Sequence, residues 1–204
     1  MISLSKLIKK VNVIGCLGQQ ERLITNICFD SRKVKTNDLF IAIKGVSSNG
    51  HDFIQQAIDH GASVIICENQ PDNLINSVTY ITVKDTSHTL SIISSNLYDN
   101  PSSKIKLVGI TGTNGKTTIV NLLYQIFTRC GFKVGVISTI ENKIGDLTID
   151  STHTTPNSLQ INNLLSQMVT EQCSFCFMEV SSHAVVQKRI SFLEFDAGVF
   201  SNIT

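Results

Sequence analysis

The segment Gly109-Ile-Thr-Gly-Thr-Asn-Gly-Lys-Thr-Thr118 combines closely spaced glycines with a lysine and several threonines. An apolar run precedes it and a helical pattern follows it, which is the strand–loop–helix context that a phosphate-binding loop requires. Small residues allow backbone N–H groups to converge on an anion, and the positive end of the following helix adds to the attraction. The segment therefore predicts a site for the phosphates of a nucleotide.

Individual residues of this loop have separate expected roles. Lys116 would reach the β- and γ-phosphates, and the Thr117 hydroxyl would bind Mg²⁺. The expected ATP-binding residues are Gly112, Thr113, Asn114, Gly115, Lys116, Thr117 and Thr118. The general pattern has a glycine where this chain has Ile110, so the match to a generic NTPase is incomplete. A glycine-rich turn followed by a chance Lys-Thr pair is the alternative.

A carboxylate ends a second apolar run. Glu179 stands at the expected carboxyl end of a parallel strand at 175–180, where α/β proteins bind ligands. Near a phosphate loop it suits Mg²⁺, a cation that prefers oxygen ligands, and a solvated carboxylate is the alternative. We expect Lys116 and Glu179 to be catalytic, and Thr117 and Glu179 to hold the metal. Ser181-Ser182-His183 follows, but without a Gly-x-Ser-x-Gly sequence we expect no serine hydrolase.

The elements that must position these residues fall into two parts. In the first part, apolar runs predict strands at 24–29, 38–43, 63–67 and 80–83. Amphipathic patterns predict helices at 52–60 and 86–98. The cluster Asn100-Pro101-Ser102-Ser103 is rich in residues that break regular structure. We therefore expect a domain boundary there, with domains at residues 1–103 and 104–204.

The second part alternates strands with helices. Strands are expected at 105–110, 133–138, 175–180 and 195–200, and helices at 117–130 and 158–172. This alternation is typical of a parallel sheet covered by helices. The expected fold class is therefore α/β, with a small N-terminal α/β domain followed by part of a P-loop parallel-sheet domain.

Composition excludes several classes of protein. The chain has 204 residues, 42% of them hydrophobic, and a net charge of +1, so it can form a core and is not expected to bind nucleic acid. No apolar run reaches the roughly 18 residues that span a bilayer, and residues 1–10 predict a short amphipathic helix and no signal peptide. We expect a cytoplasmic protein without a membrane partner.

The six cysteines include one C-x-x-C pair, Cys173 and Cys176. Such a pair can be a redox centre or half of a zinc site. No second pair completes the four ligands of structural zinc. We therefore favour burial of both residues in an apolar stretch.

Several segments, in order along the chain, resemble the Mur ligases. Thr111–Thr117 resembles the ATP loop of this family and of its folate-ligase relatives, which carry this variant of the P-loop. Asp30-Ser31-Arg32, with Asp38–Ala42 and Gly45, resembles the N-terminal UDP-binding domain of the MurE-type branch. Further similar segments are Thr154–Pro156, Met178–His183, Gln187, Arg189 and Phe200–Thr204.

The resemblance implies a site for UDP-N-acetylmuramoyl-L-alanyl-D-glutamate. The implied substrate-binding residues are Phe29, Ser31, Val46, Ser47, Ser48, His153, Thr154, Thr155, Ser181, Gln187 and Arg189. His153 stands where relatives have Asn. From the residues alone, Thr154 and Thr155 suit either an anion site or a helix cap, and Phe29 suits a core position equally well. Arg189 suits either a carboxylate clamp or an ordinary surface arginine.

The resemblance also implies ATP-dependent amide-bond formation in peptidoglycan synthesis, with ATP and Mg²⁺ as cofactors. A diamino acid is the second substrate, meso-diaminopimelate in preference to L-lysine. Later parts of the family, including a carbamylated lysine and a C-terminal domain, lie beyond the position of Thr204. We therefore expect this chain alone to be inactive, and the full-length protein to be monomeric. A non-catalytic fragment that binds nucleotide and UDP-sugar is the alternative. A GTPase is not expected, because Asn142-Lys143-Ile144-Gly145 lacks the Asp that ends the guanine-specificity motif Asn-Lys-x-Asp.

Overall fold

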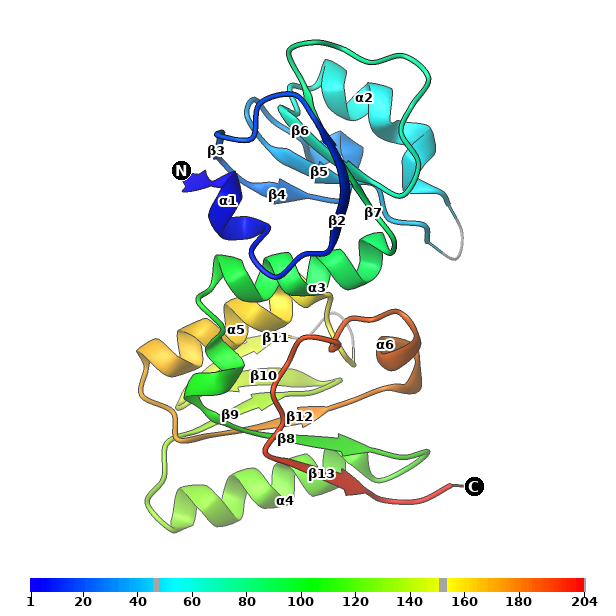
Figure 1. Cartoon of the computed structure of the whole chain (residues 1–204). Helices are drawn as coiled ribbons and strands as arrows, with labels where there is room; N and C mark the ends of the chain where they lie inside the picture. Colours follow the sequence, from blue (N-terminus) through cyan, green and yellow to red (C-terminus); the bar gives the residue numbers. More distant parts are fainter. Residues whose placement is uncertain (46–47, 151–153, 204) are drawn as a thin grey trace. The chain divides into compact units, whose positions relative to one another are not determined.

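The computed structural model describes residues 1–45, 48–150 and 154–203. The chain divides into two compact units, Met1–Leu97 and Tyr98–Thr204 (Figure 1). The division falls at the end of helix α3 (Thr86–Leu97). The cluster Asn100–Ser103 lies in the second unit, where most of it belongs to the 3₁₀ helix η3 (Pro101–Lys104). Three expected site residues, Val46, Ser47 and His153, lie outside the described residues.

A five-stranded sheet, in the order β2-β7-β6-β5-β4, forms the centre of the first unit. Its parallel strands are β4 (Ile27–Cys28), β5 (Leu39–Ile41), β6 (Val64–Cys67) and β7 (Thr79–Val83). Strand β2 (Val13–Leu17) pairs with β7 in the antiparallel direction and was not predicted. Strands β5, β6 and β7 match the expected apolar runs because both faces of this sheet are covered.

The prediction of one strand over 24–29 was wrong. Ile24 belongs to β3 (Leu23–Ile24), which pairs with β1 (Ile2–Ser3) in a separate two-stranded sheet. Thr25 and Asn26 separate β3 from β4, and their backbone groups bond to Asn37 and Leu39. An apolar run therefore serves two sheets, which its hydrophobicity alone does not reveal.

Helices cover the sheet of the first unit. Helix α2 (Ile54–Asp59), preceded by the 3₁₀ helix η2 (Gly50–Phe53), packs with Phe40 and Tyr80 in one buried cluster. Helix α1 (Leu4–Leu7) contacts α3, and Figure 1 places both on the other side of this sheet from α2. The short N-terminal helix and the helix over 86–98 were both predicted.

A six-stranded sheet, in the order β11-β10-β9-β12-β8-β13, forms the second unit. Strands β8 (Lys106–Thr111), β9 (Val134–Ile137), β12 (Phe175–Glu179) and β13 (Ala197–Phe200) are parallel, as expected. The hairpin of β10 (Glu141–Ile144) and β11 (Leu147–Asp150) is antiparallel and was not predicted. Strand β11 is the outermost strand, β10 lies between it and β9, and both carry polar residues, so they lack the apolar run of a buried central strand.

Two helices cover opposite faces of this sheet. Phe177 of β12 packs with Val120 of α4 (Lys116–Arg129), whereas Cys176 and Met178 pack in the cluster that contains α5 (Ser158–Thr170). Because successive strand residues point to opposite faces, this alternation places one helix on each side. The C-x-x-C pair is therefore part of the core, as favoured from the sequence, and burial raises the pKa of both thiols.

The strand register determines which loops of the second unit meet. Ile110 of β8 lies opposite Glu179 of β12 on one side and Val199 of β13 on the other. The residues that follow β8, β9, β12 and β13 therefore gather at one edge of the sheet, the place where open α/β sheets bind ligands. Among the described residues, no helix is both long and apolar enough to cross a membrane.

Candidate functional site

A cavity of about 700 Å³ lies at this edge of the second unit. It brings together several of the expected site residues: the phosphate loop from Gly112 to Thr117, Thr154, Glu179 and Ser181. Thr139, His183, Phe200 and Asn202 also line it. The cavity therefore joins the loops after all four parallel strands, as the register requires.

The phosphate loop has the expected strand before it and helix after it. It leaves β8 at Thr111 and enters α4 at Lys116, with Gly115 in a left-handed conformation (φ +84°) as the first flanking residue of the helix. The Lys116 Nζ donates to the carbonyl oxygens of Gly112 (2.6 Å) and Thr113 (3.1 Å). The loop thus holds its own cation beside the helix N-terminus, where an anion is also stabilised by the helix dipole.

Glu179 has no exposed surface of its own to bulk solvent, yet it lines the cavity. Thr139 donates to both carboxylate oxygens, through its backbone N–H (3.2 Å to Oε1) and its hydroxyl (2.9 Å to Oε2). Each oxygen keeps a lone pair, so the carboxylate can still act as a ligand. Sequence reasoning missed Thr139, although its place just after β9 was an available signal.

The donor set fits Mg²⁺ better than a transition metal. The described residues contain no cluster of three or more His, Cys, Asp or Glu side chains that could hold a metal by themselves. Thr117 and Glu179 both line the cavity. Mg²⁺ is commonly held by one or two carboxylates together with substrate phosphates and water, which needs no complete protein cage.

Thr155 has a structural position behind Glu179. Its buried hydroxyl donates to the Glu179 backbone oxygen (3.0 Å) and accepts from the Ser181 N–H (3.1 Å). Asn157, with Gln160 in a capping box, caps α5, so the interpretation of the threonine pair as that helix's cap was wrong. Ser181 itself caps the short helix α6 (Ser182–Val186).

Arg189 and Gln187 meet next to Thr155. The Arg189 guanidinium donates to the Gln187 side-chain oxygen through Nε and Nη2, and to the Thr155 carbonyl oxygen through Nη1 (2.6 Å). These three expected substrate residues therefore form one connected group. The Arg189 N–H groups already donate to neutral oxygens. A ligand carboxylate would have to replace these oxygens as the acceptor.

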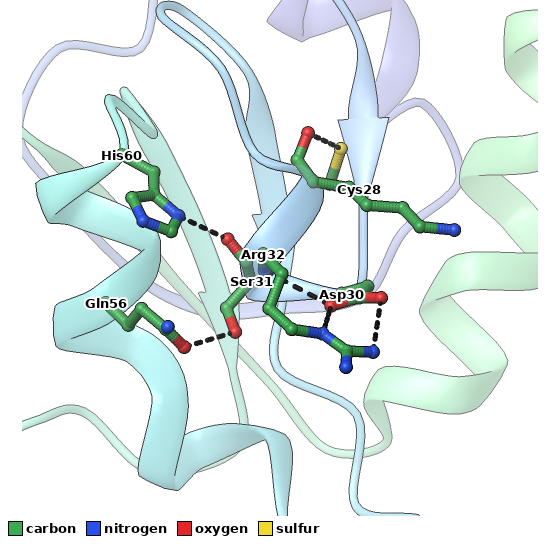
Figure 2. Close-up of polar contacts among 7 residues, drawn as sticks. Cys28, Asp30, Ser31, Arg32, Gln56 and His60 are labelled. Atoms are coloured by element: carbon green, nitrogen blue, oxygen red, sulfur yellow. Dashed lines mark hydrogen bonds and ion pairs between the residues drawn. The ribbon is translucent and has the colours of Figure 1, made fainter.

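In the first unit, the expected substrate residues follow β4 and β5, which are adjacent and parallel. Ser31 begins the 3₁₀ helix η1 (Ser31–Lys33), and Figure 2 shows it held from two directions. Its hydroxyl donates to Gln56 Oε1 (2.7 Å), and its carbonyl oxygen lies 2.8 Å from His60 Nδ1. Since a carbonyl only accepts, Nδ1 carries the proton. Gln56 and His60 come from or just follow α2, and sequence reasoning missed both.

The neighbours of Ser31 have contrasting environments. Asp30 caps η1 and pairs with Arg32 through both carboxylate oxygens (Figure 2), and this pairing holds the pKa of Asp30 below its usual value. Phe29 is 38% exposed, so its interpretation as a core residue was wrong. Ser48 is exposed and accepts from the Gly45 N–H (2.9 Å) through its backbone oxygen.

Comparison with known proteins agrees with both units. Residues 110–204 match the family model of the Mur ligase middle domain, and residues 23–98 match the model described as the Mur ligase family, catalytic domain. The chain belongs to the Mur ligase family. The two matches together cover most of both units.

This Mur ligase chain is similar to several enzymes named UDP-N-acetylmuramoyl-L-alanyl-D-glutamate–2,6-diaminopimelate ligase. It is 52% identical to the one from Cytophaga hutchinsonii over 204 residues, 46% identical to that from Phocaeicola vulgatus over 203, and 43% identical to that from Clostridium tetani over 205. Each alignment covers 100% of this chain and 42% of the relative. The chain thus spans less than half the length of these relatives.

Solved structures agree on the fold of the Mur ligase chain. A ligase with the same name covers 100% of it, and 40% of the solved chain, with a TM-score of 0.78 at 23% identity. A MurF ligase from Thermotoga maritima, solved in complex with ADP, covers 87% of it, and 37% of the solved chain, with a TM-score of 0.55 at 23% identity.

Proposed function

We propose that this chain supplies the ATP-phosphate site and the acceptor-nucleotide site of a peptidoglycan-precursor ligase. The whole enzyme would add meso-diaminopimelate to UDP-N-acetylmuramoyl-L-alanyl-D-glutamate in the cytoplasm, at the expense of ATP. One observation carries the proposal: the cavity of the second unit joins a lysine-containing phosphate loop to the buried carboxylate of Glu179. That combination suits phosphoryl transfer from a magnesium-bound nucleotide.

The choice of substrates rests on the relatives. The three relatives whose sequences are aligned above are all named as 2,6-diaminopimelate ligases, and the first is 52% identical. L-Lysine is the alternative diamino acid. This chain covers 42% of the relatives, so we propose that ligation needs more of the protein than the two units described.

The proposed reaction has two steps. A carboxylate of the acceptor attacks the γ-phosphorus of ATP, the bond to ADP breaks, and an acyl phosphate forms. The amine of the diamino acid then attacks the acyl carbon, and phosphate leaves from the tetrahedral intermediate as the amide bond forms. Proteins accelerate such transfers chiefly by positioning the reactants and stabilising charge.

The residues of the cavity have matching roles in this proposal. Lys116 and the N–H groups at the start of α4 would hold the phosphates of ATP, and the other residues of Gly112–Thr118 would complete the nucleotide site around them. Thr117 and Glu179 would hold Mg²⁺, which neutralises phosphate charge when bound. We infer that Thr139 keeps the Glu179 carboxylate in place, because it donates to both of its oxygens.

The acceptor would contact the remaining expected residues. We propose that Thr154, Ser181, Gln187 and Arg189 bind its peptide part, while Thr155 supports them through Glu179 and Ser181. In the first unit, Phe29, Ser31 and Ser48 would contact the uridine diphosphate part, since they follow two adjacent parallel strands. The Ser31 hydroxyl donates to Gln56, so it would offer a ligand its lone pairs.

Calorimetric titration tests the proposal directly. The chain would be titrated with Mg-ATP and, separately, with UDP-N-acetylmuramoyl-L-alanyl-D-glutamate. We expect Lys116→Ala to weaken Mg-ATP binding and Arg189→Ala to weaken binding of the UDP-linked acceptor. Arg129→Ala, at the exposed end of α4, is the matched control and should change neither.

The outcomes separate the proposal from its alternative. Binding of both ligands with these selective losses supports the two sites. Failure of a folded chain to bind either ligand would contradict the proposal. Binding of nucleotide that is insensitive to Lys116→Ala would show that the cavity is not the ATP site. Turnover of all substrates by this chain would contradict the need for further protein.

A further inference from the structure

The segment after β13 lies directly against the phosphate loop, although the two are far apart in sequence. Asn202 accepts two hydrogen bonds from the loop: the Thr113 N–H donates to its backbone oxygen (3.0 Å), and the Asn114 N–H donates to its side-chain Oδ1 (3.0 Å). Ser201 donates from its hydroxyl to the Asn114 carbonyl oxygen (2.7 Å). We call Ser201 and Asn202 the strap.

The strap is anchored to the sheet as well as to the loop. Ser201 donates its backbone N–H to the Thr111 carbonyl oxygen (2.9 Å), and its single hydroxyl proton is shared between that oxygen (3.2 Å) and the Asn114 carbonyl oxygen. Phe200, just before it, pairs with Thr111 across the parallel strands β13 and β8. The strap therefore connects the ends of β13 and β8 to the loop.

Gly112 is the loop residue that allows this close approach. A Cβ at this position would collide with Ser201 Oγ and would lie 3.0 Å from both the backbone N and the O of Asn202. Its φ of +136° is also one that residues with side chains rarely adopt. Gly112 thus permits both the positive φ and the close contact between the loop and the strap.

The strap decides which backbone groups of the loop can face a phosphate. The Thr113 and Asn114 N–H groups are directed to Asn202, so they do not contribute to an anion cradle in this arrangement. The first N–H groups of a helix have no partner within it, so those at the start of α4 remain to bind phosphate. Holding Thr113 and Asn114 in place orients the peptide groups that follow them.

We propose that Asn202, assisted by Ser201, is a positioning residue for the ATP-phosphate loop. The inference rests on the proposed function of the cavity. Without the Asn202 side chain, the loop loses the acceptor for the Asn114 N–H and must be ordered by the nucleotide when it binds. The cost of that ordering lowers the affinity for the phosphate-bearing ligand.

The experiment compares Asn202→Ala with the unmodified chain in two measurements. Titration with Mg-ADP gives the Kd, and amide hydrogen exchange, followed by NMR without nucleotide, reports on the loop. We expect a Kd roughly 5- to 10-fold higher, as for the loss of one hydrogen bond. We also expect faster exchange of the Asn114 amide with unchanged exchange within α4, which shows that the fold is intact.

Two further variants sharpen the result. Asn202→Asp keeps an oxygen acceptor and should keep the Asn114 amide protected. Ser201→Ala removes one shared hydroxyl proton but leaves the Asn202 acceptor of the Asn114 N–H in place, so it should raise the Kd less than Asn202→Ala. Asn163 is a half-buried residue of α5. The variant Asn163→Ala is the matched control and should leave the Kd unchanged.

The outcomes distinguish this inference from the proposed function. If the unmodified chain binds neither ATP nor ADP, the proposed function of the cavity fails, and the inference fails with it. If it binds, but Asn202→Ala binds equally well, the inference alone is overturned. A higher Kd with unchanged exchange of the Asn114 amide would also overturn it, because Asn202 would then act on the nucleotide directly.

Discussion

At the scale of single residues, the feature that most affects chemistry is the pairing of Glu179 with Thr139. A buried carboxylate is costly unless hydrogen bonds compensate its loss of water. Thr139 provides two such bonds from one residue. Glu179 can therefore stay buried at the carboxyl end of β12 and still line the cavity.

Thr139→Ala should therefore destabilise the protein. The substitution removes the hydroxyl bond to a charged group, which costs about 1.5–3 kcal/mol of unfolding free energy. Chemical denaturation without metal would measure the change, and Thr139→Ser should recover most of it because the hydroxyl returns. Thr128→Ala, on the exposed surface of α4, is the control. Equal stability of Thr139→Ala and the unmodified chain would contradict the role given to Thr139.

At the scale of elements, α2 supports the turn that carries Ser31. His60 and Gln56 bond to the carbonyl oxygen and the hydroxyl of the same residue, so helix and turn are held together at two points. His60→Ala should lower the unfolding free energy by about 1 kcal/mol, the usual net value of one such bond. His88→Ala, an exposed histidine, should change it little, and the two variants can be compared by denaturant unfolding. A loss no larger than that of His88→Ala would argue against this support.

Strand β13 is attached to β8 by a pair of charges at its start. Asp196 accepts from Lys106 Nζ (2.7 Å) and from the Leu107 N–H (2.9 Å), and these bonds hold the pKa of its carboxyl below the usual value. A carboxyl whose folded pKa is lowered stabilises the fold above its unfolded pKa, and that stabilisation is lost as the pH falls through the folded pKa.

Asp196→Asn should therefore be less stable than the unmodified chain at pH 7. The gap should close as the pH falls below about 4, the ordinary range of an aspartate. Unfolding curves at a series of pH values measure this, with Asp72→Asn, an exposed aspartate, as the control. A gap that persists unchanged at low pH would mean that the carboxylate charge does not stabilise β13.

At the scale of the whole molecule, the cysteines report on burial in both units. Cys130 is exposed and Cys16 is half-buried, while the other four thiols are buried and unpaired. Burial raises the pKa of Cys28 and of Cys67 to about 11, so little reactive thiolate forms at neutral pH.

A thiol-reactive probe at pH 8 should therefore modify Cys130 first and the four buried cysteines only after unfolding. Mass spectrometry of timed samples would identify the modified positions. Added zinc should leave the melting temperature unchanged, because Cys173 and Cys176 belong to the core. Rapid modification of Cys173 or Cys176 in the folded protein would contradict this assignment.

The sequence by itself determined features that depend on neighbours along the chain. The strand–loop–helix around Lys116, the helices α3, α4 and α5, and the buried parallel strands follow from glycine placement and hydrophobic periodicity. The same local patterns supported the resemblance to the Mur ligases. Periodicity failed where strands carry many polar residues, as in β10 and β11, or where one apolar run serves two sheets, as at Ile24 and Ile27.

Only the tertiary structure decided which distant residues meet. Thr139 reaches Glu179, and Asn202 reaches Thr113 and Asn114, because parallel strands bring the ends of separate segments to one edge. The Thr155 hydroxyl likewise bonds to the Glu179 backbone oxygen, 24 residues away in sequence. Hydrophobic periodicity reports whether a residue is buried, but the partner of a polar group depends on strand order and register, which local sequence does not encode.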